Sequence, residues 1–200
     1  MLGAPKTMII TDVKAWQPAA DSPPDWRTSM GQILVAVETD DGLRGYGVGG
    51  GGLASIHIIR AVLRDLLVGR SADEISRLSM LMHDATLPFG RMGVAIMAIS
   101  GVDLALWDLR GKRSGKLIVE LLEGKPGAIL PTYVTVGLAD DILDDAIAAG
   151  HRAFKLFVGR DRSANRVAAT IERVKEARRA VGPEAPLMID AWMKWDVETS

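Results

Sequence analysis

Apolar and polar positions follow one pattern up to residue 126 and a different one after it. The β-branched stretch 7–16 predicts a strand, and two apolar stretches on either side of Asp41-Gly42, within 32–49, predict a hairpin. Apolar residues at helical spacing then predict three helices, at 56–69, 72–85 and 92–115. Strands followed by helices indicate an α+β domain, which we assign to residues 1–126.

Three small residues mark the expected boundaries of the first two of these helices. Ser55 and Ser71 each stand just before a predicted helix, where a serine side chain could accept a hydrogen bond from a free backbone N–H group of the first turn. Gly69 stands where the first helix should end, because glycine readily takes the left-handed conformation found there.

After residue 126 the predicted elements alternate strictly. Strands are expected at 132–137, 153–159 and 186–190, with helices at 140–150 and 164–182. The second helix carries an apolar face of Val167, Ile171, Val174 and Val181. Such β-α-β-α-β alternation predicts parallel strands, either in an open doubly wound sheet or in a (β/α)8 barrel. In a barrel, residues 127–200 would form only the first part of the second domain.

Composition excludes several classes of site. The chain has no cysteine, so disulfides, cysteine metal sites and cysteine nucleophiles are excluded, and a cytoplasmic location is expected. The net charge of −1 gives no general attraction to nucleic acid or to an acidic membrane. Neither a signal peptide nor an apolar run of the roughly 20 residues needed to span a bilayer is found. None of the three histidines has metal-ligand spacing with another; they are His57, His83 and His151.

A glycine run at Gly45–Gly50 matches the G-x-G-x-x-G pattern of dinucleotide sites. That fingerprint belongs to a parallel βαβ unit with an acidic residue ending the next strand, whereas here the run ends a hairpin and Asp65 lies in a predicted helix. We therefore favour a mobile loop at 47–54 that closes over a pocket, as lids of this composition do.

The most specific stretch is "SGVDLALWDLRGK" (100–112), followed by "LIVELLEG" (117–124). Alone, it reads as a packed helix with solvated charges. Its order of residues, however, resembles the mandelate racemase and muconate-lactonising branch of the enolase superfamily. The resemblance runs along the whole chain. It implies that residues 1–126 form an α+β capping domain and that 127–200 form about the first three βα units of a barrel.

The strand that contains Lys155 supplies the first candidate site residue. Alternation places Lys155 and Phe157 on one face of that strand. Many members of the family carry Lys-x-Lys here, with the first lysine on the substrate carboxylate and the second acting as a base. The resemblance therefore implies that Lys155 is a catalytic residue, while Phe157 replaces the second lysine. The alternative for Lys155 is a surface lysine with no catalytic role.

Asp190 ends the apolar run "PLMID" (186–190), where a bare buried carboxylate would cost free energy unless it were paired or bound to a cation. The resemblance implies that Asp190 is the first of three carboxylate ligands for Mg²⁺, the other two being glutamates on later strands. The alternative is an aspartate that caps a helix. Trp192 follows on the same face, and "DAWMKWDV" (190–197) is most similar to dehydratases of rhamnonate-like sugar acids.

Family resemblance implies a reaction that begins with removal of the proton α to a carboxylate, through an enediolate that Mg²⁺ stabilises. Phe157 cannot act as the lysine base of racemases and lactonising enzymes. We therefore expect a lyase that dehydrates a sugar acid to a 2-keto-3-deoxy acid, with a His-Asp base on later strands. Two alternatives stay open: a racemase, epimerase or cycloisomerase of the family, and a member that binds its ligand without catalysis.

Substrate specificity is expected to come from the loops of the capping domain. Trp26 and Arg27 lie in one such loop, 21–28, and Arg27 could grip hydroxyl or carboxylate groups of a small-molecule sugar acid. The alternative is an exposed Trp-Arg pair without a substrate role. Family members commonly form dimers or octamers, so the resemblance also implies a homo-oligomer.

Overall fold

The computed structural model describes residues 7–18, 31–137, 140–158 and 166–197. The chain divides into two compact units, Met1–Gly127 and Ala128–Ser200. Each unit has its own buried apolar cluster. Across the described ranges, no helix combines the length and apolar character that crossing a bilayer requires.

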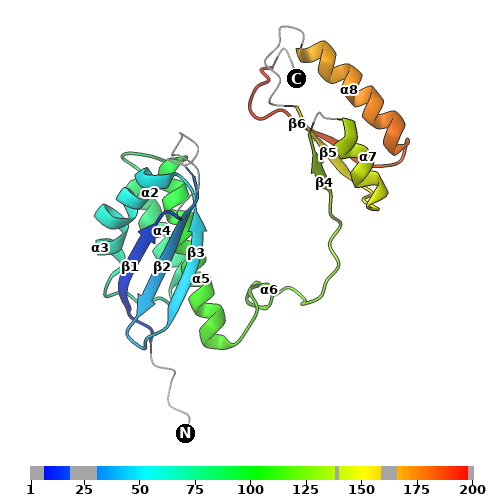
Figure 1. The fold of residues 1–200 in the computed structure, drawn as a ribbon. Coiled ribbons are helices and arrows are strands. Elements are labelled where there is room, and N and C mark those ends of the chain that lie inside the picture. Colours follow the sequence, from blue (N-terminus) through cyan, green and yellow to red (C-terminus); the bar gives the residue numbers. More distant parts are fainter. Residues whose placement is uncertain (1–6, 19–30, 138–139, 159–165, 198–200) are drawn as a thin grey trace. The chain divides into compact units, whose positions relative to one another are not determined.

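A three-stranded antiparallel sheet forms one layer of the N-terminal unit (Figure 1). Its strands are β1 (Ile10–Trp16), β2 (Ile33–Thr39) and β3 (Arg44–Gly49), in the order β1-β2-β3. The predicted hairpin at Asp41-Gly42 is confirmed, and Gly42 takes the positive φ of 83° that its turn requires.

Helices pack on one face of this sheet. They are α2 (Gly52–Ile58), the π-helix η1 (Ile59–Leu63), α3 (Arg64–Leu67) and α5 (Val94–Ser114). The helices α4 (Ile75–Thr86) and α6 (Ile118–Leu121) pack against α5. The long helix α5 lies behind β2 and β3 and places Val102 and Leu106 in the core (Figure 1). Strands and helices in this order confirm the α+β domain expected from the sequence.

The glycine run serves close packing between β3 and α5. Gly45, Gly47 and Gly49 alternate along β3 and face the helix. A Cβ on Gly47 would collide with the backbone oxygen of Gly101, and a Cβ on Gly45 with that of Ala105. Only glycine lets the strand approach the helix this closely, so the run is a packing feature.

The predicted mobile loop at 47–54 is wrong for the same reason. Residues 47–49 belong to β3 and residues 52–54 to α2, so only Gly50 and Gly51 connect the two elements. Gly51 makes the sharp turn with a φ of 80°. A connection this short, flanked by packed elements, has no length to act as a lid.

Both predicted serine caps are also wrong. Ser55 lies inside α2, where its buried hydroxyl donates a hydrogen bond of 3.1 Å to the Val94 carbonyl. The helix α4 begins at Ile75 without a side-chain cap, and the Ser71 hydroxyl accepts a hydrogen bond from the Asp73 N–H instead. The first helical segment therefore begins earlier than predicted and the second begins later.

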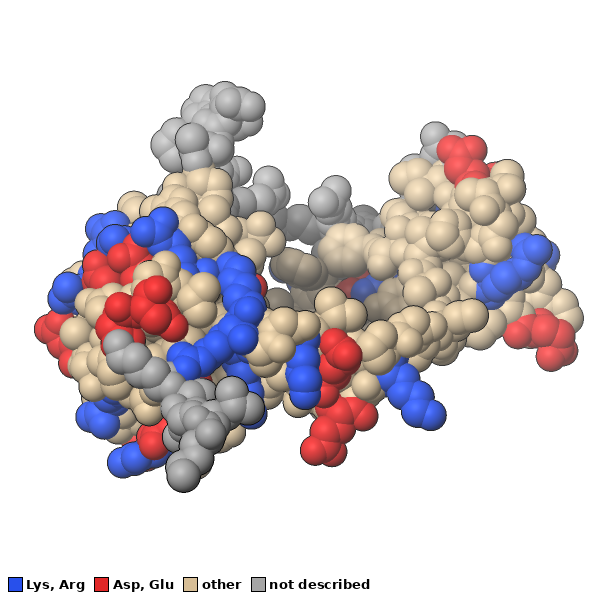
Figure 2. Space-filling model, turned by 90° about the horizontal axis from the view of Figure 1, so that it is seen from below, with Lys and Arg blue, Asp and Glu red and all other residues tan. Residues whose placement is uncertain are grey.

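Charged side chains of both signs alternate on the sheet face away from the helices. Lys14 and Arg44 both pair with Glu38, at 2.9 Å and 2.6 Å. Figure 2 shows basic and acidic side chains interspersed on the side of this unit that it presents. Paired, mixed charges of this kind contribute little to stability but keep the face solvated.

The C-terminal unit has the predicted alternation. Its elements are β4 (Val134–Val136), α7 (Asp140–Ala148), β5 (Phe154–Phe157), α8 (Arg166–Val181) and β6 (Leu187–Asp190). The three strands are parallel, in the order β4-β5-β6. Gly150 and Gly182 end the two helices with positive φ values of 89° and 81°. Three parallel strands joined by two helices confirm the expected start of a β/α array.

One face of this sheet is covered by the two helices. Phe154 and Leu156 of β5 are buried there with Leu143 of α7 and Ala177 of α8. The other face carries the remaining side chains of the strands, Lys155 among them, because side chains alternate along a strand.

The inward face of α8 differs in part from the prediction. Val174 and Val181 pack on the apolar cluster as expected, while Val167 and Ile171 are exposed. Ala177 and Thr170 take the buried positions instead. Small side chains at these positions let α8 lie close to the sheet. A prediction that counts only large apolar residues does not identify such positions.

Candidate functional site

The candidate site lies at the carboxyl ends of the parallel strands in the C-terminal unit. Lys155 is aligned with Met188, and Phe157 is aligned with Asp190. Aligned residues of parallel strands point to the same side of a sheet, so Lys155, Phe157 and Asp190 share the face that α7 and α8 leave uncovered. The strand pairing therefore brings together Lys155 and Asp190, the two charged residues that the sequence predicted for the site.

Lys155 and Asp190 form an ion pair. The Lys155 Nζ lies 3.2 Å from the Asp190 Oδ2, with 23% and 34% of the two side chains exposed. The second carboxylate oxygen, Oδ1, accepts a hydrogen bond of 3.0 Å from the backbone N–H of Trp192. Both oxygens of the carboxylate that ends the apolar strand are thus engaged by the protein itself.

These contacts shift the two pKa values in the directions that favour charge. The N–H of Trp192 is the largest influence on Asp190 and lowers the pKa of its carboxyl, and Lys155 lowers it further. The carboxylate in turn raises the pKa of Lys155. Both side chains are therefore ionised at neutral pH.

Aromatic rings surround the ion pair. The Lys155 ammonium lies 5.2 Å from the centre of the Tyr133 ring, within the range of a cation–π contact. The rings of Phe157 and Trp192 meet edge to face, with their centres 5.7 Å apart. The site therefore combines one cation and one anion with flat apolar surfaces, an arrangement suited to a small polar ligand that carries a carboxylate.

A tight turn follows Asp190. Trp192 and Met193 have positive φ values of 49° and 57°, and the Lys194 N–H donates to the Ala191 carbonyl over 3.0 Å. The strand ends at Asp190, so the expected strand alternation from Asp190 to Trp192 is wrong. The turn rather than the strand brings the Trp192 ring to Phe157. Positive φ in a non-glycine residue costs free energy and is often found at functional sites.

The remaining predicted site residues are placed differently. Trp26 and Arg27 lie outside the described residues. Sequence reasoning missed Tyr133, which precedes β4 and lies on the same face as Lys155. Alternation along β4, read together with that along β5, could have found it.

The described residues offer one carboxylate at this site for a metal ion. Magnesium needs several oxygen ligands in a near-octahedral arrangement, and both oxygens of Asp190 already have partners. Within the described ranges, no group of three or more His, Cys, Asp or Glu side chains could hold a metal ion. The described part of the chain alone therefore does not form a magnesium site.

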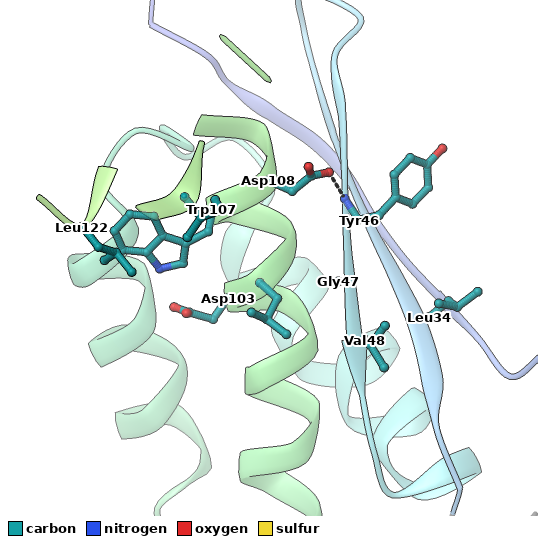
Figure 3. Close-up of a pocket in the computed structure, with 10 residues that line it drawn as sticks. Leu34, Tyr46, Gly47, Val48, Asp103, Trp107, Asp108 and Leu122 are labelled. Carbon is teal, nitrogen blue, oxygen red and sulfur yellow. Dashed lines mark hydrogen bonds between the residues drawn. The ribbon is translucent and has the colours of Figure 1, made fainter. Parts of the chain in front are cut away.

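A second hollow, lined mainly by apolar side chains, lies in the N-terminal unit (Figure 3). It encloses about 560 Å³ beside the edge of β3, and Leu34, Tyr46, Val48, Leu104 and Trp107 are among the side chains that line it. Its two carboxylates have protein partners. Ser79 and Trp107 act to lower the pKa of the Asp103 carboxyl, although burial outweighs them, and Asp108 accepts a hydrogen bond of 2.7 Å from the Tyr46 N–H. The hollow thus offers apolar surface but little chemistry, so the strand-end site is the better candidate.

Comparison with known families gives two matches along the chain. Residues 9–123 match the mandelate racemase / muconate lactonizing enzyme N-terminal domain. Residues 138–200 match the enolase C-terminal domain-like family. The two matched segments fall in the two compact units of the structure.

Curated relatives include enzymes of two kinds. The chain is 35% identical to an L-rhamnonate dehydratase of Saccharopolyspora erythraea, over 84% of this chain and 43% of that one. It is also 35% identical to a 3,6-anhydro-alpha-L-galactonate cycloisomerase of Streptomyces coelicolor, over 83% of this chain and 48% of that one. The chain thus spans about half the length of these relatives.

Among solved structures, a racemase from Streptomyces coelicolor with bound magnesium is similar in fold and sequence. It superposes with a TM-score of 0.71 at 34% identity, over 84% of this chain and 52% of that one. The two chains are therefore similar in three-dimensional fold as well as in sequence.

Proposed function

Because the chain belongs to the mandelate racemase / muconate lactonizing enzyme family of the enolase superfamily, with a capping domain and part of a barrel-type domain, we propose that it dehydrates a sugar acid. The observation that carries the proposal is the strand-end pair of Lys155 and Asp190 with Phe157 beside it. The similarity to an L-rhamnonate dehydratase supports the same substrate class.

Phe157 favours dehydration over racemisation. Racemisation at the α-carbon needs a base on each face of the substrate, and an aromatic hydrocarbon ring cannot accept a proton. Lys155 is held by Asp190, and its raised pKa keeps its proton in place. This side of the site therefore lacks a free base, which suits a reaction that needs only one.

The reaction requires that one proton and one hydroxyl leave the substrate. A base removes the proton from C2, and the C2–H electron pair moves onto the carboxylate, which gives an enediolate. The enediolate then forms a C2–C3 double bond as the C3 hydroxyl takes a proton from a general acid and departs as water. The resulting enol takes up a proton at C3, loses the proton of its C2 hydroxyl and becomes a 2-keto-3-deoxy acid. In this scheme the Lys155 ammonium binds the substrate carboxylate and stabilises the negative charge that develops on it.

Asp190 supplies one carboxylate to a proposed Mg²⁺ site, which the magnesium in the similar racemase structure supports. A bound dication would add electrostatic stabilisation of the same developing charge. Trp192 bounds the site on the side of Phe157, where its ring can pack against the carbon chain of the substrate. Trp26 and Arg27 remain proposed contacts for the rest of the sugar.

Incubation of the full-length protein with sugar acids in D₂O and Mg²⁺ tests the proposal. We expect a 2-keto-3-deoxy product and no epimerisation at C2 of the recovered substrate, both measured by NMR. A mixture of C2 epimers without keto acid would replace the dehydratase with a racemase. No reaction with a broad panel of sugar acids would favour a binding protein without catalysis.

A cycloisomerase is the second candidate because one relative of equal identity carries that activity. A cycloisomerase opens or closes a ring by breaking or forming a carbon–oxygen bond, and no water is lost. Mass spectrometry of the same reaction mixture separates the two activities, because only dehydration yields a product lighter than the substrate by one water molecule.

A further inference from the structure

The sheet of the N-terminal unit has two edges, β1 and β3. The outer side of β1 bonds to the backbone that follows α3. The Ile10 N–H donates to the Arg70 carbonyl over 2.9 Å, and the Ile10 carbonyl accepts the Gly69 N–H over 2.8 Å. Further along the strand, the Arg60 guanidinium donates to the Ala15 carbonyl over 2.9 Å. The β1 edge is therefore covered at both ends.

The outer side of β3 faces no other strand of the described residues. In an antiparallel pair, alternate residues turn their N–H and C=O groups toward the partner strand. The Thr39 N–H donates to the Leu43 carbonyl at the start of the pairing, so the odd-numbered residues of β3 bond to β2. Arg44, Tyr46 and Val48 therefore turn their backbone groups outward. Such a row of outward groups is a template for pairing with another chain.

Two charged side chains of α5 reach this outer side. The Asp108 Oδ2 accepts a hydrogen bond of 2.7 Å from the Tyr46 N–H (Figure 3). The Lys112 Nζ donates to the Arg44 carbonyl over 2.8 Å. Asp108 and Lys112 also pair with each other at 2.6 Å, and the ammonium lies 4.8 Å from the centre of the Tyr46 ring. The pair thus offers an acceptor and a donor to adjacent backbone groups, as the backbone of a neighbouring strand would.

Stability alone does not account for this arrangement. The side chains of Asp108 and Lys112 are 35% and 41% exposed, and ion pairs at such positions contribute little to stability. Their hydrogen bonds to the backbone are charge-assisted, which holds both side chains along the strand. Tyr46 and Val48 are exposed residue types that favour strands. Without its partners on α5, this edge would be well suited to pair with another strand.

We propose that Asp108 and Lys112 cap the edge of β3 and keep it from pairing with the β3 of a second copy of the chain. A second copy is the partner that fits, because two identical edges can run antiparallel about a two-fold axis. The cap gives two charged positions of the stretch 100–112 a role in keeping copies apart. Val48 lies beyond the two capped residues and marks the end from which pairing would begin.

A cysteine at this end reports pairing directly, because the chain has no cysteine of its own. Val48→Cys is introduced into the full-length protein, alone and together with Asp108→Ala or Lys112→Met. A short bis-maleimide joins thiols of paired copies and tolerates a register shift of a few residues, since a strand rises about 3.4 Å per residue. Denaturing gel electrophoresis follows the rate of cross-linking. We expect Asp108→Ala and Lys112→Met each to raise this rate about tenfold.

Conservative variants test whether the bonds to the backbone carry the effect. Asp108→Asn keeps an acceptor for the Tyr46 N–H, and Lys112→Arg keeps a donor for the Arg44 carbonyl. Both should therefore cross-link at a rate close to that of the protein with its native cap. Equal cross-linking rates for the native cap, Asp108→Ala and Lys112→Met would overturn the proposal.

Glu74→Ala and Arg77→Met are the matched controls for charge. Glu74 and Arg77 form another exposed ion pair of this unit, at 3.0 Å, so the two variants make the same changes in net charge away from β3. Neither should change the cross-linking rate. A rise as large as that of the cap variants would show that charge, and not the cap, keeps the copies apart, and would also overturn the proposal.

Hydrogen exchange in the native protein gives a second measurement that needs no variant. The Tyr46 N–H is held by Asp108, whereas the Val48 N–H lies beyond the cap. The Tyr46 amide should therefore exchange with D₂O at least about tenfold more slowly than the Val48 amide, measured residue by residue with NMR. Equal exchange rates would show that the cap does not protect the edge in solution and would reject the proposal.

Discussion

Asp103 in the N-terminal unit and Asp190 in the C-terminal unit are the same side chain in two different surroundings. Asp103 lies on α5 beside an apolar hollow, where partial burial raises the pKa of its carboxyl although Ser79 and Trp107 act to lower it. The pKa of Asp190 is lowered by the Trp192 N–H and by the Lys155 ammonium.

The difference lies in burial and in the partners, because burial is the largest influence on Asp103, whereas the Trp192 N–H and then the Lys155 ammonium favour the charged form of Asp190. The Trp192 N–H and a cationic partner keep Asp190 ionised on a sheet face that α7 and α8 leave uncovered, as the proposed ligand role requires. Residue type alone therefore does not set the ionisation of a carboxylate, whereas its burial and its partners do.

Asp190→Asn should have the largest effect, on catalysis. The amide keeps the shape but removes the charge that pairs with Lys155 and that would bind a cation. We expect the kcat of the full-length protein to fall by about a thousandfold or more, with an unchanged circular dichroism spectrum. In contrast, Asp103→Asn should leave kcat unchanged. Near-normal turnover of Asp190→Asn at saturating Mg²⁺ would remove Asp190 from the site.

Lys155→Met should have the next largest effect. Loss of the ammonium removes the group proposed to bind the substrate carboxylate, and kcat/KM should fall by about a hundredfold. Lys175→Met, on the exposed surface of α8, serves as the control and should retain normal kinetics. If the steady-state kinetics of Lys155→Met match those of the wild type, Lys155 is a surface lysine with no catalytic role, which is the alternative that the sequence left open.

Gly47→Ala should affect stability instead of chemistry. Its Cβ would collide with the backbone oxygen of Gly101, so β3 and α5 would have to move apart. We expect a loss of about 2 kcal/mol in the free energy of unfolding, measured by urea denaturation. Val48→Ala, at the neighbouring exposed position, should cost less than about 1 kcal/mol. Similar stabilities for both variants would show that the glycine is not needed for packing.

Sequence patterns predicted the parts of the fold that local periodicity determines. Lys155 and Asp190 could be found because strand alternation and an apolar run that ends in a carboxylate are visible within a few residues. Their mutual contact depends on strand order and register, which the sequence did not specify without the family resemblance. Tyr133 was missed because its importance arises only when β4 lies beside β5.

The wrong predictions share a cause in distant packing. The role of Gly47 depends on Gly101 of α5, and Ser55 forms its hydrogen bond with Val94 at the start of α5. Neither partner is near in sequence, so local rules assigned a lid to the glycines and a cap to the serine. Packing between elements decided both cases.

Asp103→Asn should have the smallest effect, and it tests the opposite pKa shifts of the two aspartates. The pKa of Asp103 is raised in the folded protein, mainly by burial, so folding favours its protonated form. Its stabilising contribution is fully present below the unfolded-state pKa of about 4 and is lost as the pH rises through the higher folded-state value. Wild-type stability should therefore decline over this window relative to that of Asp103→Asn, which cannot ionise. Urea denaturation of the two proteins between pH 3 and pH 7 gives the difference directly. A difference that does not vary with pH would show that Asp103 is as well solvated as an ordinary surface aspartate, and the contrast with Asp190 would then rest on the Trp192 N–H and on Lys155 alone.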